Sequence, residues 1–362
     1  MPRTPNAVDF WRGYALVSIF VNHIPGIYFE RFTHRNVSFS DSAELFVFLA
    51  GWSLGYLVGG SDAPKSTPRL MLRLGSRAFQ IYAAQILISS LAIATLASAA
   101  FLLDNPLILE WHNAAAVFLD PALTHIGLVL LTHQLGYFDI LPLYVVLMVV
   151  AAPLVALIYR FGRPLLVPLS LAIYLAALIV PITVPTWPVP GQWFFNPLAW
   201  QVLFVLGFAL SRPDGIGDFV QRHINVIRLV ALPITALSAA VALFSLFPDP
   251  TIFPEPKLLF LNGKTFLTPV RLLQFLALAA VMSVTYVYIA RGVPWLVAFL
   301  ALLGRNSLNV FCVASVLSLL GQIVRYLYSR SFGVDTVIVV VGIALLWLTA
   351  WVSEWRQQRA SG

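Results

Sequence analysis

Long apolar runs joined by short polar connectors constrain the fold of this chain more than any other feature. The sequence is 60% hydrophobic and 10% charged over 362 residues, whereas soluble domains contain about 25% charged residues. A helix needs roughly 20 apolar residues to cross the hydrocarbon core of a bilayer, and several runs approach that length. We therefore predict an all-α polytopic membrane protein that forms a single integral-membrane domain over residues 1–362, with the lipid bilayer around it.

The apolar runs predict about ten transmembrane helices. They are expected over residues 9–29, 43–60, 76–103, 140–159, 165–184, 197–211, 228–247, 270–290, 306–328 and 334–353. The first run carries charge and lacks a cleavage site of small residues, so we expect it to remain as a transmembrane helix and not to be removed as a signal peptide.

The distribution of positive charge predicts the orientation in the membrane. Of the 22 Lys and Arg residues, fourteen fall in one set of alternate connectors and seven in the other, and cytoplasmic connectors carry such an excess. Both termini are therefore expected in the cytoplasm, and the connector at 104–139, which has no Lys or Arg, on the outside. Because orientation explains the net charge of +7, no nucleic-acid partner is expected. The single cysteine, Cys312, lies in an apolar run, so neither a disulfide nor a metal site is expected.

Two polar residues on the first predicted helix are candidates for chemistry. Arg12 and His23 are eleven residues apart, which places them on one face of a helix with a rise of about 16 Å between them. Asp9 stands one turn before Arg12, so an alternative is that Arg12 only reaches the cytoplasmic headgroups with Asp9 as its counter-ion. An ionisable side chain inside a membrane usually faces a cavity or a partner. His23 is therefore a candidate catalytic or ligand-binding residue.

The second predicted helix opens on a pair of carboxylates. Asp41 and Glu44 are three residues apart, which fits a capping box that satisfies the first amides of the helix. Either carboxylate is also a candidate partner of His23, because a short connector brings the outer ends of the two helices together. A carboxylate behind an imidazole fixes its tautomer and raises its basicity, as a general base acting on an alcohol requires. Gly51 and Gly55 later in this helix predict tight helix packing.

The next connector is basic. Its sequence "KSTPRLMLRLGSR" places Lys65, Arg69, Arg73 and Arg77 at near-helical spacing. Guanidinium groups bind phosphates through paired hydrogen bonds. In addition to setting the orientation, this connector is therefore a candidate for holding the phosphates of an anionic cytosolic ligand.

Four blocks of the sequence, in this order, resemble the OpgC family, which belongs with the acyltransferase-3-like membrane O-acyltransferases. They are the Arg12-x10-His23 spacing, "FSDSAELFVFLAG", "HQLGYFDILPLY" and "LGRNSLNVF". The resemblance implies a bacterial cytoplasmic (inner) membrane enzyme that transfers succinyl from succinyl-CoA to hydroxyls of osmoregulated periplasmic glucans. It also implies that His23 is the catalytic base and that Arg12 contacts the acyl donor. The late histidine often found after the "G-x-x-S" block of acyltransferase-3 proteins is absent from "GRNSLNVFCVAS", so no second catalytic histidine is expected there.

A cytosolic donor and an outside acceptor require a path along the first helix. We expect the CoA phosphates to dock near Arg12, Arg69 and Arg73, and the thioester to reach His23 through a polar shaft. Transfer also needs donors to the tetrahedral oxyanion and a cation for the succinyl carboxylate, and no metal. The oxyanion candidates are Asn22, Ser42 and Asn306, and the cation candidates are Arg305 and Arg35.

Aromatic and hydrogen-bonding residues of the outer connectors predict contacts with the acceptor sugar, although Trp and Tyr also collect at membrane interfaces. The set comprises Trp111, Trp187, Trp193, Trp200, His133, Gln134, Gln192 and Asp139. His133, Gln134 and Asp139 are favoured within it because they close an outside connector directly before a predicted helix.

Two other functions stay open. One is an acetyl-CoA-dependent O-acetyltransferase of another cell-envelope glycan. The other is a non-enzymatic transporter or flippase that uses His23 and Arg12 in an ion path; it predicts paired helices broken at mid-membrane, and the sequence suggests none. For the enzyme, direct attack by a sugar hydroxyl deprotonated by His23 and a transient acyl-histidine are both compatible with the residues.

Overall fold

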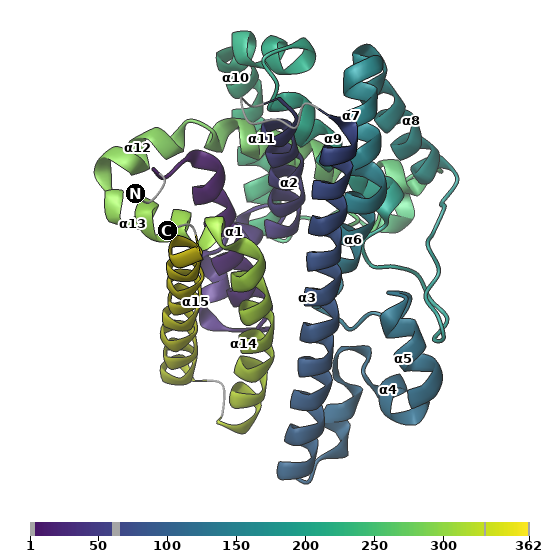
Figure 1. The fold of residues 1–362 in the computed structure, drawn as a ribbon, viewed down its shortest axis with the longest axis vertical. Helices are drawn as coiled ribbons and strands as arrows, with labels where there is room; N and C mark the ends of the chain where they lie inside the picture. Colours follow the sequence, from purple (N-terminus) through teal and green to yellow (C-terminus); the bar gives the residue numbers. More distant parts are fainter. Residues whose placement is uncertain (1–3, 60–65, 329–330, 361–362) are drawn as a thin grey trace.

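The computed structural model describes residues 4–59, 66–328 and 331–360. Every element named within these ranges is a helix (Figure 1). The α-helices are α1 (Ala7–Asn22), α2 (Ser42–Gly59), α3 (Thr67–Leu102), α4 (Ala115–Leu119), α5 (Pro121–Val129), α6 (Ile140–Val146), α7 (Ala152–Phe161), α8 (Leu166–Ile179), α9 (Pro197–Leu210), α10 (Gly215–Leu243), α11 (Pro269–Met282), α12 (Thr285–Gly292), α13 (Pro294–Arg305), α14 (Ser307–Leu327) and α15 (Phe332–Ala360). A short π-helix, Leu147–Ala151, joins α6 to α7. The predicted all-α class is confirmed.

Six of the described helical segments are long and apolar enough to cross a membrane, or seven if the bent pair α11 and α12 counts as one span. Three further apolar helices, Arg163–Ile179, Pro197–Leu210 and Pro294–Arg305, are shorter. These segments support a multi-pass membrane protein, but they do not confirm the predicted count of ten. The α11–α12 pair is bent by 43°, so the helix expected over 270–290 is broken near its middle.

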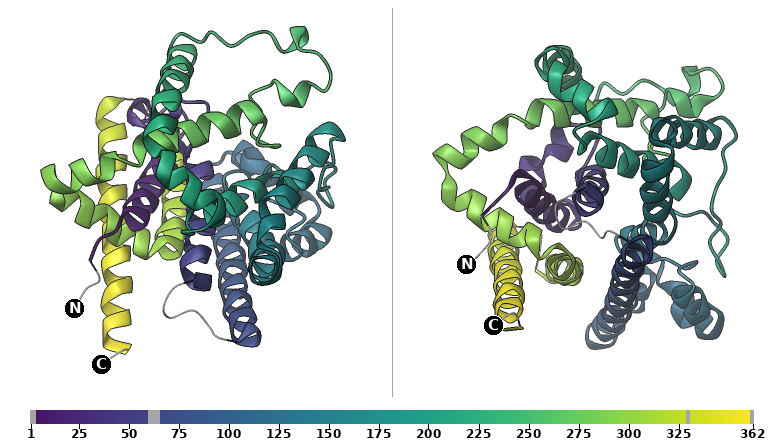
Figure 2. Two further views of the ribbon diagram at one scale, coloured as in Figure 1. Left: turned by 90° about the horizontal axis from the view of Figure 1, so that it is seen from above. Right: turned by 45° about the horizontal axis from the view of Figure 1, so that its top comes forward.

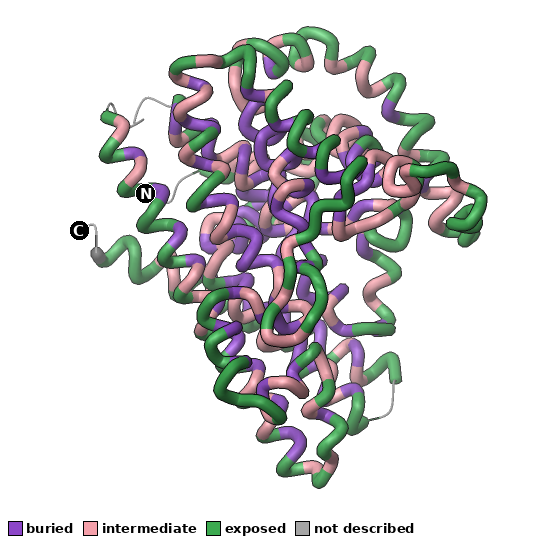
Figure 3. The backbone as a smooth tube through the Cα atoms, turned by 90° about the vertical axis from the view of Figure 1, so that its right-hand side faces the viewer, coloured by how far each residue is buried: buried purple, intermediate pink, exposed green. Residues whose placement is uncertain are grey.

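The surface of the molecule suits a lipid environment. Figure 3 shows buried backbone along the interior and exposed backbone around it. The apolar window of α10 is only 11% buried, and it presents large side chains outward, including Leu229, Val230 and Leu237. Large exposed apolar patches are rare on soluble monomers, so this face is explained by contact with lipid chains.

Glycines let two pairs of helices approach closely. On the facing helices α1 and α13, a Cβ on Gly13 would lie 1.9 Å from the Leu300 carbonyl oxygen, and a Cβ on Gly304 would lie 1.8 Å from that of Asp9. The pair α2 and α9 repeats this arrangement at Gly51, where a Cβ would meet the Phe204 carbonyl oxygen at 1.8 Å. The predicted tight packing at Gly51 is therefore confirmed, and van der Waals contact between such helices replaces the hydrophobic effect inside a membrane.

The two chain ends lie at the same end of the bundle (Figure 2). Arg305 at the end of α13 pairs with Glu354 near the end of α15 at 3.1 Å, and Gly304 packs on Asp9 near the start of α1. This arrangement agrees with two termini on one side of the membrane; that the side is the cytoplasm stays a prediction.

Several helix boundaries differ from the sequence-based expectation: α3 begins at Thr67 and not near residue 76, and α10 begins at Gly215 and not near residue 228. The helix expected over 9–29 ends at Asn22, with His23 as its C-cap, because Pro25 lacks an amide hydrogen and disfavours helical conformation at the preceding residue. Gly26 has a positive φ of +73° in the turn that follows. The helix α13 was not predicted at all, because its twelve residues are too few for a full span.

Candidate functional site

A cavity of about 220 Å³ lies between α1, α2, α3, α6 and α14, toward the end of the bundle that holds the chain termini. Its polar lining consists of Arg12, Ser53, Arg73, Arg77, Tyr144 and Ser307. Its apolar lining consists of Phe46, Ala50, Leu54, Leu57, Leu74, Ile81, Leu141, Met148, Leu308 and Phe311. Three arginines line it and no Asp or Glu among the described residues does, so the cavity is suited to an anion.

Arg12 is positioned by the second helix. Its guanidinium donates to the Ser53 hydroxyl at 2.5 Å and to the Leu49 carbonyl at 3.1 Å. These bonds turn Arg12 toward the interior of the bundle, and so the alternative in which it only reaches the headgroups is not what the structure shows. The Tyr144 hydroxyl is buried at the cavity without a hydrogen-bond partner among the described residues. A buried hydroxyl of this kind is costly unless a ligand or water completes it.

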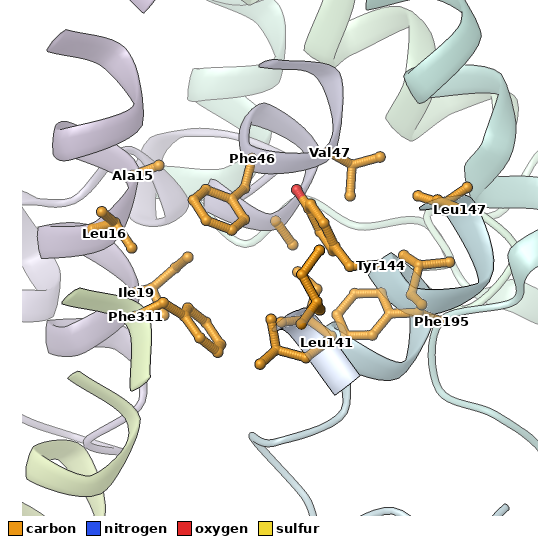
Figure 4. Close-up of a cluster of buried hydrophobic side chains, with 14 of the residues drawn as sticks. Ala15, Leu16, Ile19, Phe46, Val47, Leu141, Tyr144, Leu147, Phe195 and Phe311 are labelled. Atoms are coloured by element: carbon orange, nitrogen blue, oxygen red, sulfur yellow. The ribbon is translucent and has the colours of Figure 1, made fainter. Parts of the chain in front are cut away.

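Aromatic and aliphatic side chains close the cavity toward His23. Figure 4 shows Phe46 of α2, Phe311 of α14 and Leu141 and Tyr144 of α6 facing one another. The rings of Phe46 and Phe311 stack at 6.0 Å and those of Phe46 and Tyr144 lie 5.5 Å apart. Phe46 precedes Leu49 by one helical turn and so lies nearer than Arg12 to the end of the bundle that holds His23.

The expected polar shaft from Arg12 to His23 is therefore wrong for this conformation. Leu16 and Ile19 lie on α1 between these two residues, and both are buried. His23 is not among the described residues that line the cavity. Arg12 and His23 are eleven residues apart along α1 and its C-cap, but apolar side chains lie between them.

His23 lies in a half-buried cluster of polar rings at the other end of α1. Its ring is 4.8 Å from that of Tyr137, which is 5.2 Å from that of His112. Gln322 joins the cluster, because its amide donates to the His23 carbonyl at 2.6 Å and its oxygen lies 2.8 Å from His112 Nε2. The His23 Nδ1 atom is buried without a partner among the described residues. Among the described residues, this nitrogen therefore has no hydrogen-bond partner that would compete with a ligand for it.

The two carboxylates at the start of α2 serve other partners. The capping box is confirmed, since Glu44 accepts from the Asp41 amide at 2.9 Å. Lys264 pairs with Asp41 at 2.5 Å, and Arg271 of α11 pairs with both Asp41, at 3.3 Å, and Glu44. Burial opposes ionisation of Asp41, but Lys264 and Arg271 outweigh it and hold the pKa of this carboxyl well below its usual range. No hydrogen bond from His23 to either carboxylate is seen among the described residues, so their catalytic role stays a prediction that this geometry does not support.

The other donor-site candidates are scattered. Asn22 accepts from the Thr33 hydroxyl at 2.9 Å, and Asn306 donates to the Leu302 carbonyl at 3.0 Å at the junction of α13 and α14. Arg305 pairs with Glu354. Ser42 has a buried hydroxyl without a partner among the described residues. The structure thus brings only Arg12 and Arg73 of the predicted donor set into the cavity, together with Arg77.

The remaining basic candidates lie away from the cavity or outside the described chain. Arg69 and Arg35 are exposed and do not line the cavity. Lys65 lies outside the described residues.

Four of the eight predicted acceptor residues are buried, namely His133, Gln134, Trp193 and Trp200, whereas Trp187 and Gln192 are exposed and Trp111 and Asp139 are half-buried. His133 is 2% exposed, and neither of its ring nitrogens has a partner among the described residues. Gln134 donates to the Leu131 carbonyl at 3.1 Å, and Trp193 is 6% exposed. Burial raises the pKa of Asp139 to about 6, with Lys264 opposing and Asp41 adding to the shift. Their role in acceptor binding stays a prediction.

Some residues of both sites were not singled out from the sequence. Ser53, Tyr144 and Ser307 line the cavity, and Tyr137 and Gln322 surround His23. Tyr137 lies in the block "HQLGYFDILPLY", so that block carried a usable signal. No local sequence signal pointed to Gln322, because it is 299 residues from His23 in the sequence and only the fold brings the two together.

Comparison with known proteins gives one match. The family model described as OpgC protein matches residues 3–358. No curated protein and no solved structure matches the chain.

Proposed function

The chain belongs to the OpgC family, and on this premise we propose that it is a membrane O-acyltransferase of the bacterial inner membrane. It moves an acyl group, which we propose to be succinyl, from a cytosolic acyl-CoA to a hydroxyl of a periplasmic glucan. The observation that carries the proposal is the cavity lined by Arg12, Arg73 and Arg77 and by no carboxylate among the described residues. CoA carries three phosphate groups, and arginine forks bind phosphate oxygens with geometry that lysine does not match.

The length of the donor supports this placement. Arg12 and His23 are eleven residues apart along one helix, a rise of about 16 Å. The pantetheine arm has about thirteen bonds between its phosphate and its sulfur. An extended chain spans about 3.3–3.6 Å for every three bonds, so this arm reaches about 15 Å. Phosphates held at Arg12 would therefore place the thioester close to His23, provided that Phe46 and Phe311 move aside to admit the arm.

His23 is the proposed general base. In the direct route it takes the proton of a sugar hydroxyl while the hydroxyl oxygen attacks the thioester carbonyl carbon. The carbon–sulfur bond then breaks, and the CoA thiolate leaves with the proton that His23 returns. The uncommitted Nδ1 of His23 suits this role. Transfer through an acyl-histidine is the alternative route, and acetyl-CoA is the alternative donor.

The test is label transfer by the purified full-length protein. Succinyl-CoA and acetyl-CoA, each labelled in the acyl group, are incubated with a panel of glucans and with wild type, His23→Ala or the control His223→Ala, whose side chain is exposed on α10. We expect transfer from succinyl-CoA by wild type and His223→Ala and a loss of at least a hundredfold in His23→Ala. Undiminished transfer by His23→Ala would remove the base from the proposal, and preference for acetyl-CoA would change the donor.

A further inference from the structure

A second cavity, of about 190 Å³, lies at the opposite end of the bundle from the arginine cavity. It is lined by Ile24, Pro25, Trp111, Gln322, Arg325 and Tyr326. These residues belong to the turn after α1, to the 3-10 helix Pro106–Asn113 and to the last turns of α14. The cavity therefore lies where helices end and connectors begin, beside His23.

This outer cavity is electrically neutral. Arg325, the one cation among the described residues that line it, pairs with Asp335 at 2.6 Å. It also donates to the backbone carbonyls of Pro25 and of Gly26, the latter at 2.7 Å. Asp335 also accepts from the Tyr28 amide at 2.7 Å. The positive charge of Arg325 is thus balanced within the protein by the carboxylate of Asp335. In contrast to the arginine cavity, this one is suited to a neutral ligand.

Aromatic faces and amide groups line it. The rings of Trp111 and Tyr326 meet edge to face at 5.7 Å, and the Tyr326 hydroxyl accepts from the Asn105 amide at 2.6 Å. Gln322 adds a side-chain amide at the wall. An apolar lining with a few placed polar groups is typical of small-ligand sites. Trp and Tyr supply both an apolar face and a hydrogen-bonding group, and a sugar ring offers the same combination.

The cavity is tied to His23 by the backbone and by Gln322. Ile24 and Pro25 directly follow His23 in the chain, and Gln322 donates to the His23 carbonyl at 2.6 Å while its oxygen lies 2.8 Å from His112. The φ of His112, next to Trp111, is +58°. Such a conformation is costly for a side-chain-bearing residue and persists where its surroundings hold it. Trp111 adjoins this fixed backbone and lines the same cavity as Ile24 and Pro25, the two residues after His23.

From these contacts we propose that the outer cavity is the acceptor subsite, where one uncharged sugar residue of the glucan stacks on Trp111 and directs a hydroxyl toward His23. This inference rests on the proposed function, because it is the acceptor hydroxyl that must meet His23 in that reaction. It assigns the sugar to a different place from the buried residues His133, Gln134 and Trp193.

The test separates binding from transfer. Saturation-transfer NMR with the detergent-solubilised full chain and glucose oligosaccharides of different linkages, without any acyl-CoA, reports whether sugar protons contact the protein. The same variants are then assayed for label transfer. The variants are Trp111→Ala, Tyr326→Phe, which keeps the ring, and the control Trp295→Ala, whose side chain is 70% exposed on α13.

We expect Trp111→Ala to weaken oligosaccharide binding and to raise the KM for acceptor about tenfold or more, with the KM for acyl-CoA unchanged. Tyr326→Phe should give a smaller change of the same kind, and it covers the case in which Trp111→Ala fails to fold. Equal binding by wild type and both variants would overturn the proposal. So would loss of the signal on adding phosphatidylglycerol, because that result assigns the cavity to a lipid. If sugar binds at Trp111 but no label is transferred by wild type, the subsite stands and the proposed function fails.

Discussion

Removal of Arg77 gives the sharpest test of the arginine cavity. This residue lines the cavity, and it donates a long hydrogen bond of 3.2 Å to Gln80 on the exposed face of α3. Arg77→Ala therefore removes a phosphate ligand with little loss of packing. Arg12 is a less clean target, because it also holds Ser53 and the Leu49 carbonyl.

The expected magnitude follows from one charged hydrogen-bonding group. A hydrogen bond to a charged partner contributes about 1.5–3 kcal/mol, and 1.4 kcal/mol is tenfold in affinity. Because Arg77 is partly open to solvent, screening reduces its share, and we expect the lower end, about a tenfold rise in the KM for acyl-CoA. The KM for the glucan should be unchanged, since the sugar does not contact this cavity in our account.

The assay is label transfer at varied succinyl-CoA and two salt concentrations. The control Arg222→Ala removes the same charge from an exposed ion pair with Asp218 on α10, and it should behave as wild type. The KM of wild type should rise with salt more steeply than that of Arg77→Ala, because the variant has lost one screened attraction. A parallel rise in donor and acceptor KM, or an equal effect of Arg222→Ala, would refute the assignment of the cavity to the donor phosphates.

Three further predictions concern stability, each measured by thermal or denaturant unfolding in detergent. Gly13→Leu should prevent the close approach of α1 and α13 and cost about 3 kcal/mol or more, whereas Gly292→Leu, where a Cβ meets nothing within 4 Å, should be nearly neutral; similar losses would contradict the packing. Glu44→Ala should cost about 1.5–3 kcal/mol by removing one of the two carboxylates that pair with the buried Arg271, and a loss below about 1 kcal/mol would argue against that ion pair. The third prediction concerns Asp139, whose pKa is raised to about 6 in the folded protein. Between pH 4 and 6 this carboxyl holds a proton in the folded state that the unfolded chain has lost, so the free energy of unfolding should fall as pH rises through that window. Asp139→Asn should abolish this part of the pH dependence.

Local sequence signals predicted what local chemistry determines. The Asp41–Glu44 capping box involves residues three apart, and its hydrogen bonds form as expected. The close approach at Gly51 follows from the lack of a side chain at that residue. Basic residues at near-helical spacing before the third helix predicted an anion site, and two of them, Arg73 and Arg77, line the cavity.

The partners of these residues were beyond local signals. Arg271 reaches Glu44 from 227 residues away, and this pairing takes up a carboxylate that the sequence suggested for His23. The apolar layer between Arg12 and His23 depends on side chains such as Phe311 and Leu141, which come from other parts of the chain. A helical wheel of one segment places its own polar face correctly, but it does not show what packs against that face.

The most direct measurement is a structure of the protein with a non-reactive thioether analogue of succinyl-CoA. Our account predicts phosphates in contact with at least two of Arg12, Arg73 and Arg77, the rings of Phe46 and Phe311 moved apart, and the sulfur within reach of His23. An analogue bound outside the arginine cavity, or one whose pantetheine arm leads away from His23, would contradict it.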